Sequence, residues 1–120
     1  MKKVFVARKL LKSNEKRMSE IWYVKLNSED KIYSQSELIE LSRDCDGILC
    51  SIVDKFDAET INKLSDKVKI ISNFAVGFGN IDIKAAKKKN IIVTNTPDVL
   101  TDATAEIAIL LLLGAARRAT

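Results

Sequence analysis

Short apolar segments alternate with amphipathic segments along most of the chain. Five segments are rich in apolar and β-branched residues and are bounded by charged or turn-forming residues, as strands are. These predicted strands are residues 4–7, 22–26, 47–53, 68–71 and 91–93. The predicted helices are residues 13–21, a segment that starts at Ser34 or Ser36 and carries Leu38, Ile39 and Leu41, residues 57–65, residues 82–89, and residues 102–118.

Short polar side chains stand at several predicted helix starts. Ser13, Asp57 and Thr101 occupy positions where an oxygen can accept from the first-turn N–H groups, so we expect them to act as N-caps. The segment 22–26 alternates least clearly and suits an edge strand, whereas the inner strands are apolar on both faces. That pattern predicts an α/β fold: a flavodoxin-like five-stranded parallel sheet of order 2-1-3-4-5 with helices on both faces, plus a C-terminal helix.

The composition suits one domain and narrows the chemistry. The 120 residues include 20 Lys+Arg and 16 Asp+Glu, which gives a net charge of +4, and 47% are apolar. There is no histidine, so the commonest general acid/base and metal ligand is missing. Lys87, Lys88 and Lys89 have no interleaved aromatic residues and are expected to form a solvated helix face, with no nucleic acid as partner.

No membrane segment, secretion signal or metal site is expected. The longest apolar run, residues 107–116, is too short to span a bilayer, and the N-terminus lacks the pattern of a signal peptide. We therefore expect a cytoplasmic protein. Cys45 and Cys50 are the only cysteines; no further soft ligand lies near them, and Cys50 is expected to be a buried thiol.

The segment after the fourth predicted strand, residues 73–82, is the first candidate site. Gly77 and Gly79 allow a tight turn with successive exposed N–H groups, which the positive end of the next helix can support in binding an anion. A dinucleotide fingerprint would place a third glycine where Asp82 stands. The residues alone leave two interpretations open, a structural turn and a small-anion site.

Two other families with this sheet order are excluded by their loops. A phospho-receiver domain needs acidic residues after the first strand and an aspartate at the end of the third, where this chain has Arg8-Lys9 and Ser51-Ile52. A flavodoxin needs a hydroxyl- and glycine-rich phosphate loop after the first strand, and residues 8–11, RKLL, do not supply it.

Two motifs carry a family resemblance. NTPDVLTDATAE at 95–106 and VGFGNIDI at 76–83 together resemble the D-isomer-specific 2-hydroxyacid dehydrogenases, especially glyoxylate/hydroxypyruvate reductases. The matching stretch covers residues 68–118, and the alternation of strands and helices extends it to Met1. Many members have Asp at the position of Gly79.

The resemblance implies a site and an organisation. Residues 1–100 would form the substrate-binding domain, and residues 101–120 a crossover helix leading into a dinucleotide-binding domain. The N–H groups of Val76 and Gly77 would hold the substrate carboxylate, and Ser51 and Ile52 would line the pocket. Val76 and Thr104 would lie against the nicotinamide end of the cofactor.

The implied function is hydride transfer between NAD or NADP and a small 2-oxo acid, such as glyoxylate or hydroxypyruvate, in a homodimeric enzyme. In that family the cofactor fingerprint and the catalytic Arg, Glu/Asp and His follow the crossover helix. No catalytic residue is therefore assigned within residues 1–120, which are expected to be inactive alone. The alternative is a free-standing module that binds small carboxylates or another protein.

The last predicted helix is apolar around its whole circumference from Ala103 to Ala116. Such a helix needs cover on every side, and the predicted sheet can supply it on one face only. We therefore expect residues 103–116 to promote self-association of a chain of this length.

Overall fold

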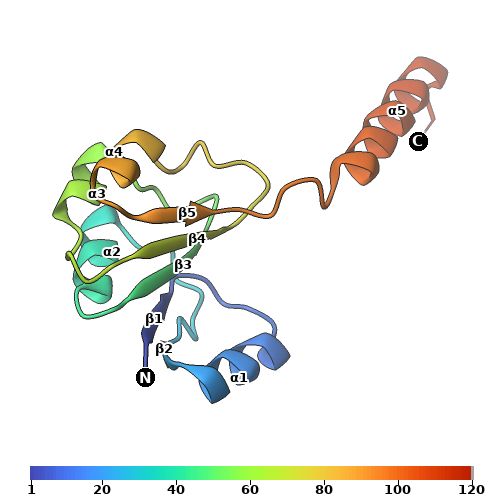
Figure 1. Ribbon diagram of the computed structural model, residues 1–120. Coiled ribbons are helices and arrows are strands. Elements are labelled where there is room, and N and C mark those ends of the chain that lie inside the picture. Colours follow the sequence, from blue (N-terminus) through green and yellow to red (C-terminus); the bar gives the residue numbers. More distant parts are fainter. Residues whose placement is uncertain (120) are drawn as a thin grey trace.

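A five-stranded parallel sheet organises the chain, and the computed structural model describes residues 1–119 (Figure 1). The strands are β1 (Lys3–Val6), β2 (Tyr23–Lys25), β3 (Gly47–Ser51), β4 (Ile70–Phe74) and β5 (Ile92–Thr94). The helices are α1 (Lys12–Ile21), α2 (Gln35–Ser42), α3 (Ala58–Lys63), α4 (Ile83–Lys88) and α5 (Thr101–Arg117). The strand order β2-β1-β3-β4-β5 confirms the predicted topology and places β2 at an edge.

The hydrophobic core lies between the sheet and the layer formed by α2, α3 and α4 (Figure 1). Phe5, Ile48 and Ile71 point into it from β1, β3 and β4, and Leu38 and Ile61 meet them from α2 and α3. All five side chains are at most 2% exposed. This packing fixes the strands whose carboxyl ends carry the candidate site.

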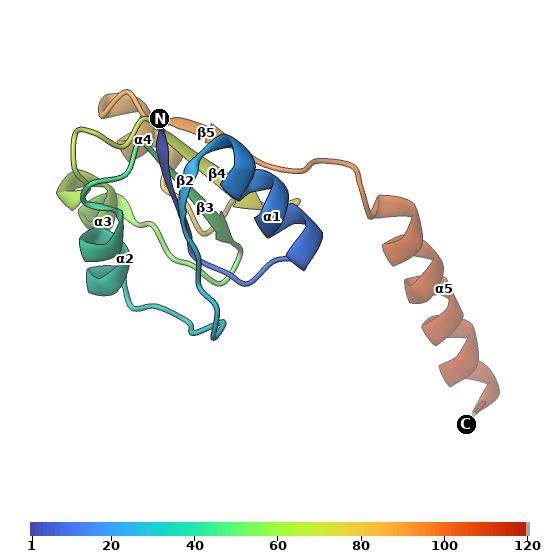
Figure 2. The ribbon, with the colours of Figure 1, turned by 90° about the horizontal axis from the view of Figure 1, so that it is seen from below.

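The opposite face of the sheet is covered unevenly, because α1 is the helix that packs there, next to β2 (Figures 1 and 2). Towards the other edge the outward side chains of β4 and β5 remain in contact with solvent: Phe74 is 63% exposed and Ile92 is 61% exposed. A groove between α1 and the sheet is lined by Met18, Trp22 and Leu49, among others. Helices on both faces are confirmed, but this face is partly bare.

Helix α5 extends away from the domain (Figures 1 and 2). None of its described residues is buried, and Leu110 to Leu113 are each more than half exposed. The expectation that the sheet covers one face of this helix is wrong, because the chain leaves β5 in an extended segment and does not turn back onto the sheet. Within residues 1–119, no helix is long and apolar enough to cross a membrane.

Several helix starts follow the expected capping chemistry. Ser34 and Glu37 form a reciprocal capping box at α2, and the Asp57 carboxylate accepts from the N–H of Thr60 at α3. Ser13 and Thr101 were wrong as caps, because both lie inside their helices, which begin after Leu11 and Leu100 without a side-chain cap.

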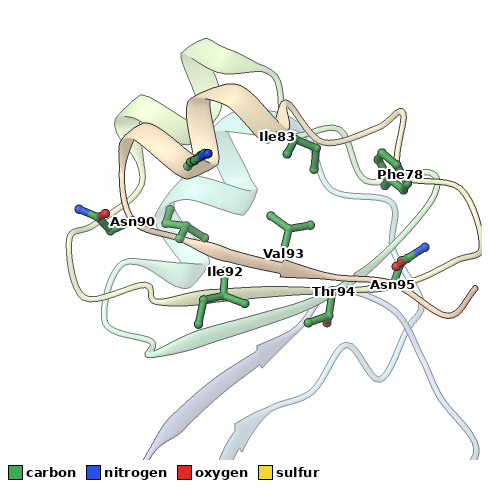
Figure 3. A pocket seen from close by; sticks show the side chains of 9 residues that line it. Phe78, Ile83, Asn90, Ile92, Val93, Thr94 and Asn95 are labelled. Carbon is green, nitrogen blue, oxygen red and sulfur yellow. The ribbon is translucent and has the colours of Figure 1, made fainter.

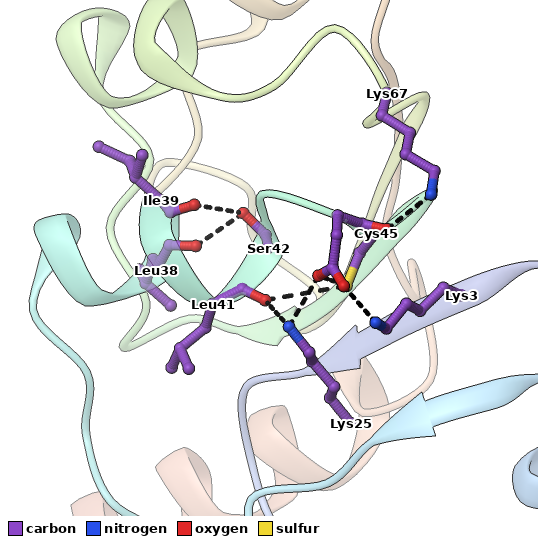
Figure 4. A network of polar contacts seen from close by, with 9 residues as sticks. Lys3, Lys25, Leu38, Ile39, Leu41, Ser42, Cys45 and Lys67 are labelled. Carbon is purple, nitrogen blue, oxygen red and sulfur yellow. Dashed lines mark hydrogen bonds and ion pairs between the residues drawn. The ribbon is translucent and has the colours of Figure 1, made fainter.

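A polar network around Asp44 ties together the start of β1, the end of β2 and the segments that precede β3 and β4. Lys3 and Lys25 both donate to the carboxylate of Asp44, at 2.7 Å for Lys25, and Lys67 donates to its carbonyl oxygen (Figure 4). The Lys25 and Lys3 ammonium groups hold the pKa of the Asp44 carboxyl well below its usual range. The network joins β1, β2 and the segments before β3 and β4.

The two cysteines are free and buried, as expected for Cys50. Burial raises the pKa of the Cys50 thiol to about 12 and also raises that of Cys45. Neither is therefore a reactive thiolate near neutral pH.

The three consecutive lysines at the end of α4 do not all face solvent. Lys87 and Lys88 are exposed. Lys89 instead donates to the carbonyl oxygens of Asn62 and Leu64 at the end of α3. The expectation of a wholly solvated basic face was wrong for Lys89, which closes the carboxyl end of a neighbouring helix.

Candidate functional site

The segments after β3 and β4 lie side by side at the carboxyl edge of the sheet. Ser51 pairs with Phe74 in the register of these strands, so the following residues enter neighbouring loops. A Cβ added to Gly77 would lie 3.9 Å from Cδ1 of Ile52. The structure therefore brings Ser51 and Ile52 close to Val76 and Gly77.

The carbonyl groups of the loop 75–77 are all held by hydrogen bonds. The N–H of Thr96 donates to the oxygen of Ala75 at 2.9 Å, and the Asn95 amide donates to the oxygen of Val76 at 2.8 Å. The Asn73 amide donates to the oxygen of Gly77 at 3.0 Å.

The N–H groups of Val76 and Gly77 have no hydrogen-bond acceptor among the described residues. Val76 is half-buried and Gly77 is exposed, so a ligand can reach this part of the loop. Two neighbouring free donors on a loop whose carbonyls are fixed are suited to a carboxylate oxygen or another small anion.

Gly77 and Gly79 were expected to be needed for a tight turn, and the structure differs from that expectation. No glycine in the described chain has a positive φ, and a Cβ at Gly79 would meet nothing within 4 Å. The backbone conformation therefore does not require either loop glycine. At Gly77 the missing side chain instead leaves the loop open on the side of Ile52.

The start of α4 does not contribute to an anion site. The carboxylate of Asp82 accepts from the N–H of Ala85 at 2.9 Å and so caps this helix with a negative charge. The expectation that the helix end supports the glycine loop was wrong. The residue that stands in place of a third glycine is a helix cap.

Two asparagines join the two loops, and the sequence analysis missed both. The Asn80 amide donates to the carbonyl oxygens of Ser51 and Asp54, at 3.0 and 2.9 Å. Its oxygen accepts from the Asn73 amide at 3.0 Å. The one signal in the sequence is that Asn73 closely follows an apolar run. In the structure Asn73 is 1% exposed and lies within β4, which continues beyond the predicted end at Ile71.

Asp54 is a further buried polar residue that the sequence analysis missed. Its Oδ2 accepts from the N–H of Ser51 at 2.8 Å, and its Oδ1 has no partner in the described chain. Burial raises the pKa of this carboxyl. The positive charge of Arg8 lowers the pKa of Asp54 in part, but its Nη2 is paired with Oδ2 of Asp30 at 2.9 Å.

Thr104 lies apart from the other predicted site residues. It is exposed in the first turn of α5, where its N–H donates to the carbonyl oxygen of Leu100. The link from the loop to the segment before α5 runs instead through Asn95 and Thr96. The structure thus does not bring Thr104 next to Val76 within this chain.

A second hollow lies beside the site, between α4 and β5, with a volume of about 490 Å³ (Figure 3). Phe78, Ile83 and Val93 give it a largely apolar lining, and Asn95 lies at its end nearest the loop (Figure 3). No group of three His, Cys, Asp or Glu residues suited to a metal ion occurs within residues 1–119.

The described residues do not fit a dinucleotide. The loop glycines do not form a phosphate cradle, and the nearest helix start carries the Asp82 carboxylate, which repels phosphate. The assignment of Val76 and Thr104 to the nicotinamide end stays a prediction.

Comparison with known proteins gives the same family at the level of sequence and structure. Residues 4–118 match the family model for the D-isomer specific 2-hydroxyacid dehydrogenase, catalytic domain. The glyoxylate reductase of Thermococcus litoralis is 41% identical over 116 residues, which are 97% of this chain and 35% of that protein. The glycerate dehydrogenase of Hyphomicrobium methylovorum is 37% identical over 118 residues, 98% of this chain and 37% of its own.

Solved structures agree. The crystal structure of a putative NAD-binding D-isomer specific 2-hydroxyacid dehydrogenase from Polaromonas superposes with a TM-score of 0.84 at 33% identity, over 96% of this chain and 36% of that one. The NADPH-dependent glyoxylate/hydroxypyruvate reductase of Sinorhizobium meliloti, solved with NADP and malonate, gives 0.71 at 29% identity, over 94% and 34%. The chain thus spans about a third of the length of these relatives. Over residues 4–118 it belongs to the D-isomer specific 2-hydroxyacid dehydrogenase family, as the catalytic domain.

Proposed function

We propose that residues 1–100 form the substrate-binding domain of a D-2-hydroxyacid dehydrogenase that reduces a small 2-oxo acid, such as glyoxylate or hydroxypyruvate, with NADH or NADPH. Residues 101–120 would lead into a dinucleotide-binding domain, and the whole enzyme would be a homodimer. The observation that carries the proposal is the loop 75–77, with its three carbonyls held and the N–H groups of Val76 and Gly77 free.

The loop would bind the substrate by its carboxylate. Two N–H groups that donate to one anionic carboxylate form charge-assisted bonds, which are about twice as strong as neutral ones. Ile52 would cover the apolar side of a small substrate, while Ser51 would line the pocket beside it. Because the carboxylate is fixed, the neighbouring 2-oxo group has one orientation, as transfer of a hydride to its carbon requires.

The described residues supply binding and orientation, and we assign them no step of the hydride transfer. The cofactor would contribute the hydride, with Val76 and Thr104 close to its nicotinamide end. Thr104 reaches that position only if α5 packs against a further domain.

A chimera tests the proposal. Residues 1–120 replace the matching segment of the Thermococcus litoralis glyoxylate reductase, and the product is assayed with glyoxylate and NAD(P)H. We expect activity, and we expect Gly77→Pro to lower kcat/KM by about 10²-fold or more, because it removes one oriented donor. Gly79→Ala is the matched control, since its Cβ has open space. Unchanged kinetics in a folded Gly77→Pro chimera would show that the loop is only a turn.

The same assay on residues 1–120 alone separates the two candidate functions. We expect no oxidation of NAD(P)H with glyoxylate or hydroxypyruvate, because the sequence contains no histidine to transfer a proton and the described loops offer no phosphate cradle. Protein-dependent turnover contradicts that expectation. Tight carboxylate binding by this chain, together with an inactive chimera, would favour the free-standing binding module.

A further inference from the structure

Asn80 lies between the two loops that would contact the substrate. Its amide nitrogen donates to the carbonyl oxygens of Ser51 and Asp54, and its amide oxygen accepts from Asn73. Asn73 in turn donates to the carbonyl oxygen of Gly77. A continuous chain of hydrogen bonds, each 2.9 to 3.0 Å long, therefore runs from the loop after β3 to the loop after β4.

The backbone around Asn80 is held as firmly as its side chain. The N–H of Phe56 donates to the carbonyl oxygen of Asn80 at 2.8 Å, and the N–H of Asp82 donates to that of Phe56 at 2.8 Å. Phe56 is fully buried. Asn80 is thus anchored to the core while its amide reaches both loops.

The amide network fixes what a substrate would meet. The bond from Asn73 to the carbonyl of Gly77 fixes the peptide group between Gly77 and Phe78, at the carboxyl end of the loop. The peptide groups that carry the free N–H groups of Val76 and Gly77 are adjacent to it, and their own carbonyls are held by Thr96 and Asn95. Holding the carbonyls of Ser51 and Asp54 sets the position of Ile52, whose Cδ1 lies 3.9 Å from a Cβ added to Gly77. Asn80 therefore links the carboxyl end of the loop that carries the donors to the segment that sets the width of the gap beside them.

We infer that Asn80 is a positioning residue for carboxylate binding, which aligns the loop 75–77 with the segment 51–54 through Asn73 and the carbonyls of Ser51 and Asp54. The inference rests on the proposed function, since it takes the free donors as the carboxylate site. Asn80 acts through the loops and does not itself contact the substrate.

The test compares the chain of residues 1–120 with Asn80→Ala by NMR, using oxalate as the carboxylate probe. We expect oxalate to shift the amide signals of Val76 and Gly77, and Asn80→Ala to weaken its binding by about tenfold or more. Without oxalate, we expect relaxation dispersion to show millisecond motion in both segments, 51–54 and 75–77, of the variant only.

Two controls separate positioning from stability. Asn62→Ala removes an exposed asparagine on α3 whose side chain makes none of the network's hydrogen bonds, and it should change nothing. Ile61→Val destabilises the core from α3, and it should lower Tm while leaving oxalate binding and both loops unchanged. If Asn80→Ala does not fold, Asn80→Ser, which retains one donor, is measured in the same way.

Each outcome decides one of the two claims. The inference is overturned if the Asn80 variant keeps its oxalate affinity and shows no millisecond motion in segments 51–54 and 75–77. It is also overturned if Ile61→Val loses as much affinity as the Asn80 variant. A wild-type chain in which oxalate leaves Val76 and Gly77 unmoved counts against the proposed function. In that case the dispersion measurement without oxalate still decides whether Asn80 aligns the loops.

Discussion

Asp54 is a fully buried carboxylate of which only one oxygen is hydrogen-bonded. Burial raises its pKa above the ordinary value of 3.8. The folded chain therefore binds this proton more firmly than the unfolded chain, and the ionised carboxylate lowers stability. The loss is absent below the ordinary pKa and grows as the pH rises through the raised folded-state value.

Replacing Asp54 by asparagine should remove that loss. Asn keeps an oxygen that accepts from the N–H of Ser51, and it carries no charge. We expect Asp54→Asn to raise Tm at pH 7 and to have a smaller effect at pH 4, as measured by circular dichroism melts at several pH values. A variant that is less stable than wild type at pH 7 would contradict this.

Asp57 provides a control of opposite sign. Its hydrogen bond from the N–H of Thr60 lowers its pKa to about 2, so the ionised form stabilises the folded chain. That contribution is present above the ordinary value of 3.8 and is lost as the pH falls through about 2. Asp57→Ala should therefore lower Tm at pH 7, and the difference should disappear near pH 2.

The residues of the candidate site differ in how far the sequence could indicate them. Ser51 and Ile52 lie at the end of β3, and Val76 and Gly77 follow β4 and belong to the motif VGFGNIDI, so the position of all four at one edge of the sheet could be predicted. Asn80 was not, because its role depends on the pairing of β3 with β4, which brings residues 29 positions apart into contact. Side-chain amides that satisfy distant carbonyls leave no periodic pattern.

Helix α1 shows how a start signal can mislead. Ser13 has the expected cap chemistry but lies inside the helix, whose first turn is joined to the preceding chain by Glu15. The Glu15 carboxylate accepts from the N–H of Leu10 at 2.9 Å. The side chain that closes this end of the helix therefore comes from within the first turn and reaches back.

A pair of variants checks that assignment. Ser13→Ala should leave Tm unchanged or raise it slightly, because Ser13 is exposed and alanine favours helix. Glu15→Ala should lower Tm, because the N–H of Leu10 loses its acceptor. Thermal melts decide between them: if Ser13→Ala proves the more damaging change, the serine acts as the cap after all.

The strands and their order were predictable because buried parallel strands are short, apolar and separated by helices. The residues at which the strands begin and end were harder to predict. β4 starts two residues later than predicted and continues through Ser72 and Asn73 to Phe74. An apolar run marks the buried part of a strand, whereas pairing with β3 carries β4 into polar residues whose side chains find partners only in the folded chain.

Residues 1–119 leave large apolar surfaces uncovered. One is the sheet face beside α1, where Phe74 and Ile92 are exposed. Another is α5, which stands clear of the domain, so that the chain measures 55 Å along its longest axis against 33 and 23 Å along the others. Sequence periodicity indicated an apolar helix correctly, but it could not show that this helix leaves the sheet altogether.

The exposed α5 predicts the behaviour of residues 1–120 in solution. Leu110, Leu111, Leu112 and Leu113 are 58 to 69% exposed, and full burial of each such side chain is worth roughly 1.5–3 kcal/mol. Their sum is comparable with the stability of a small domain, about 5–15 kcal/mol, so association that covers them is strongly favoured. We expect residues 1–120 to self-associate and residues 1–100 to be monodisperse with an unchanged fold, because α5 contributes no residue to the core.

Light scattering of both chains at several concentrations provides the measurement, with circular dichroism as the control for folding. A monomeric chain of residues 1–120 that gains nothing from truncation would mean that α5 finds cover within its own molecule, against the arrangement in Figure 2.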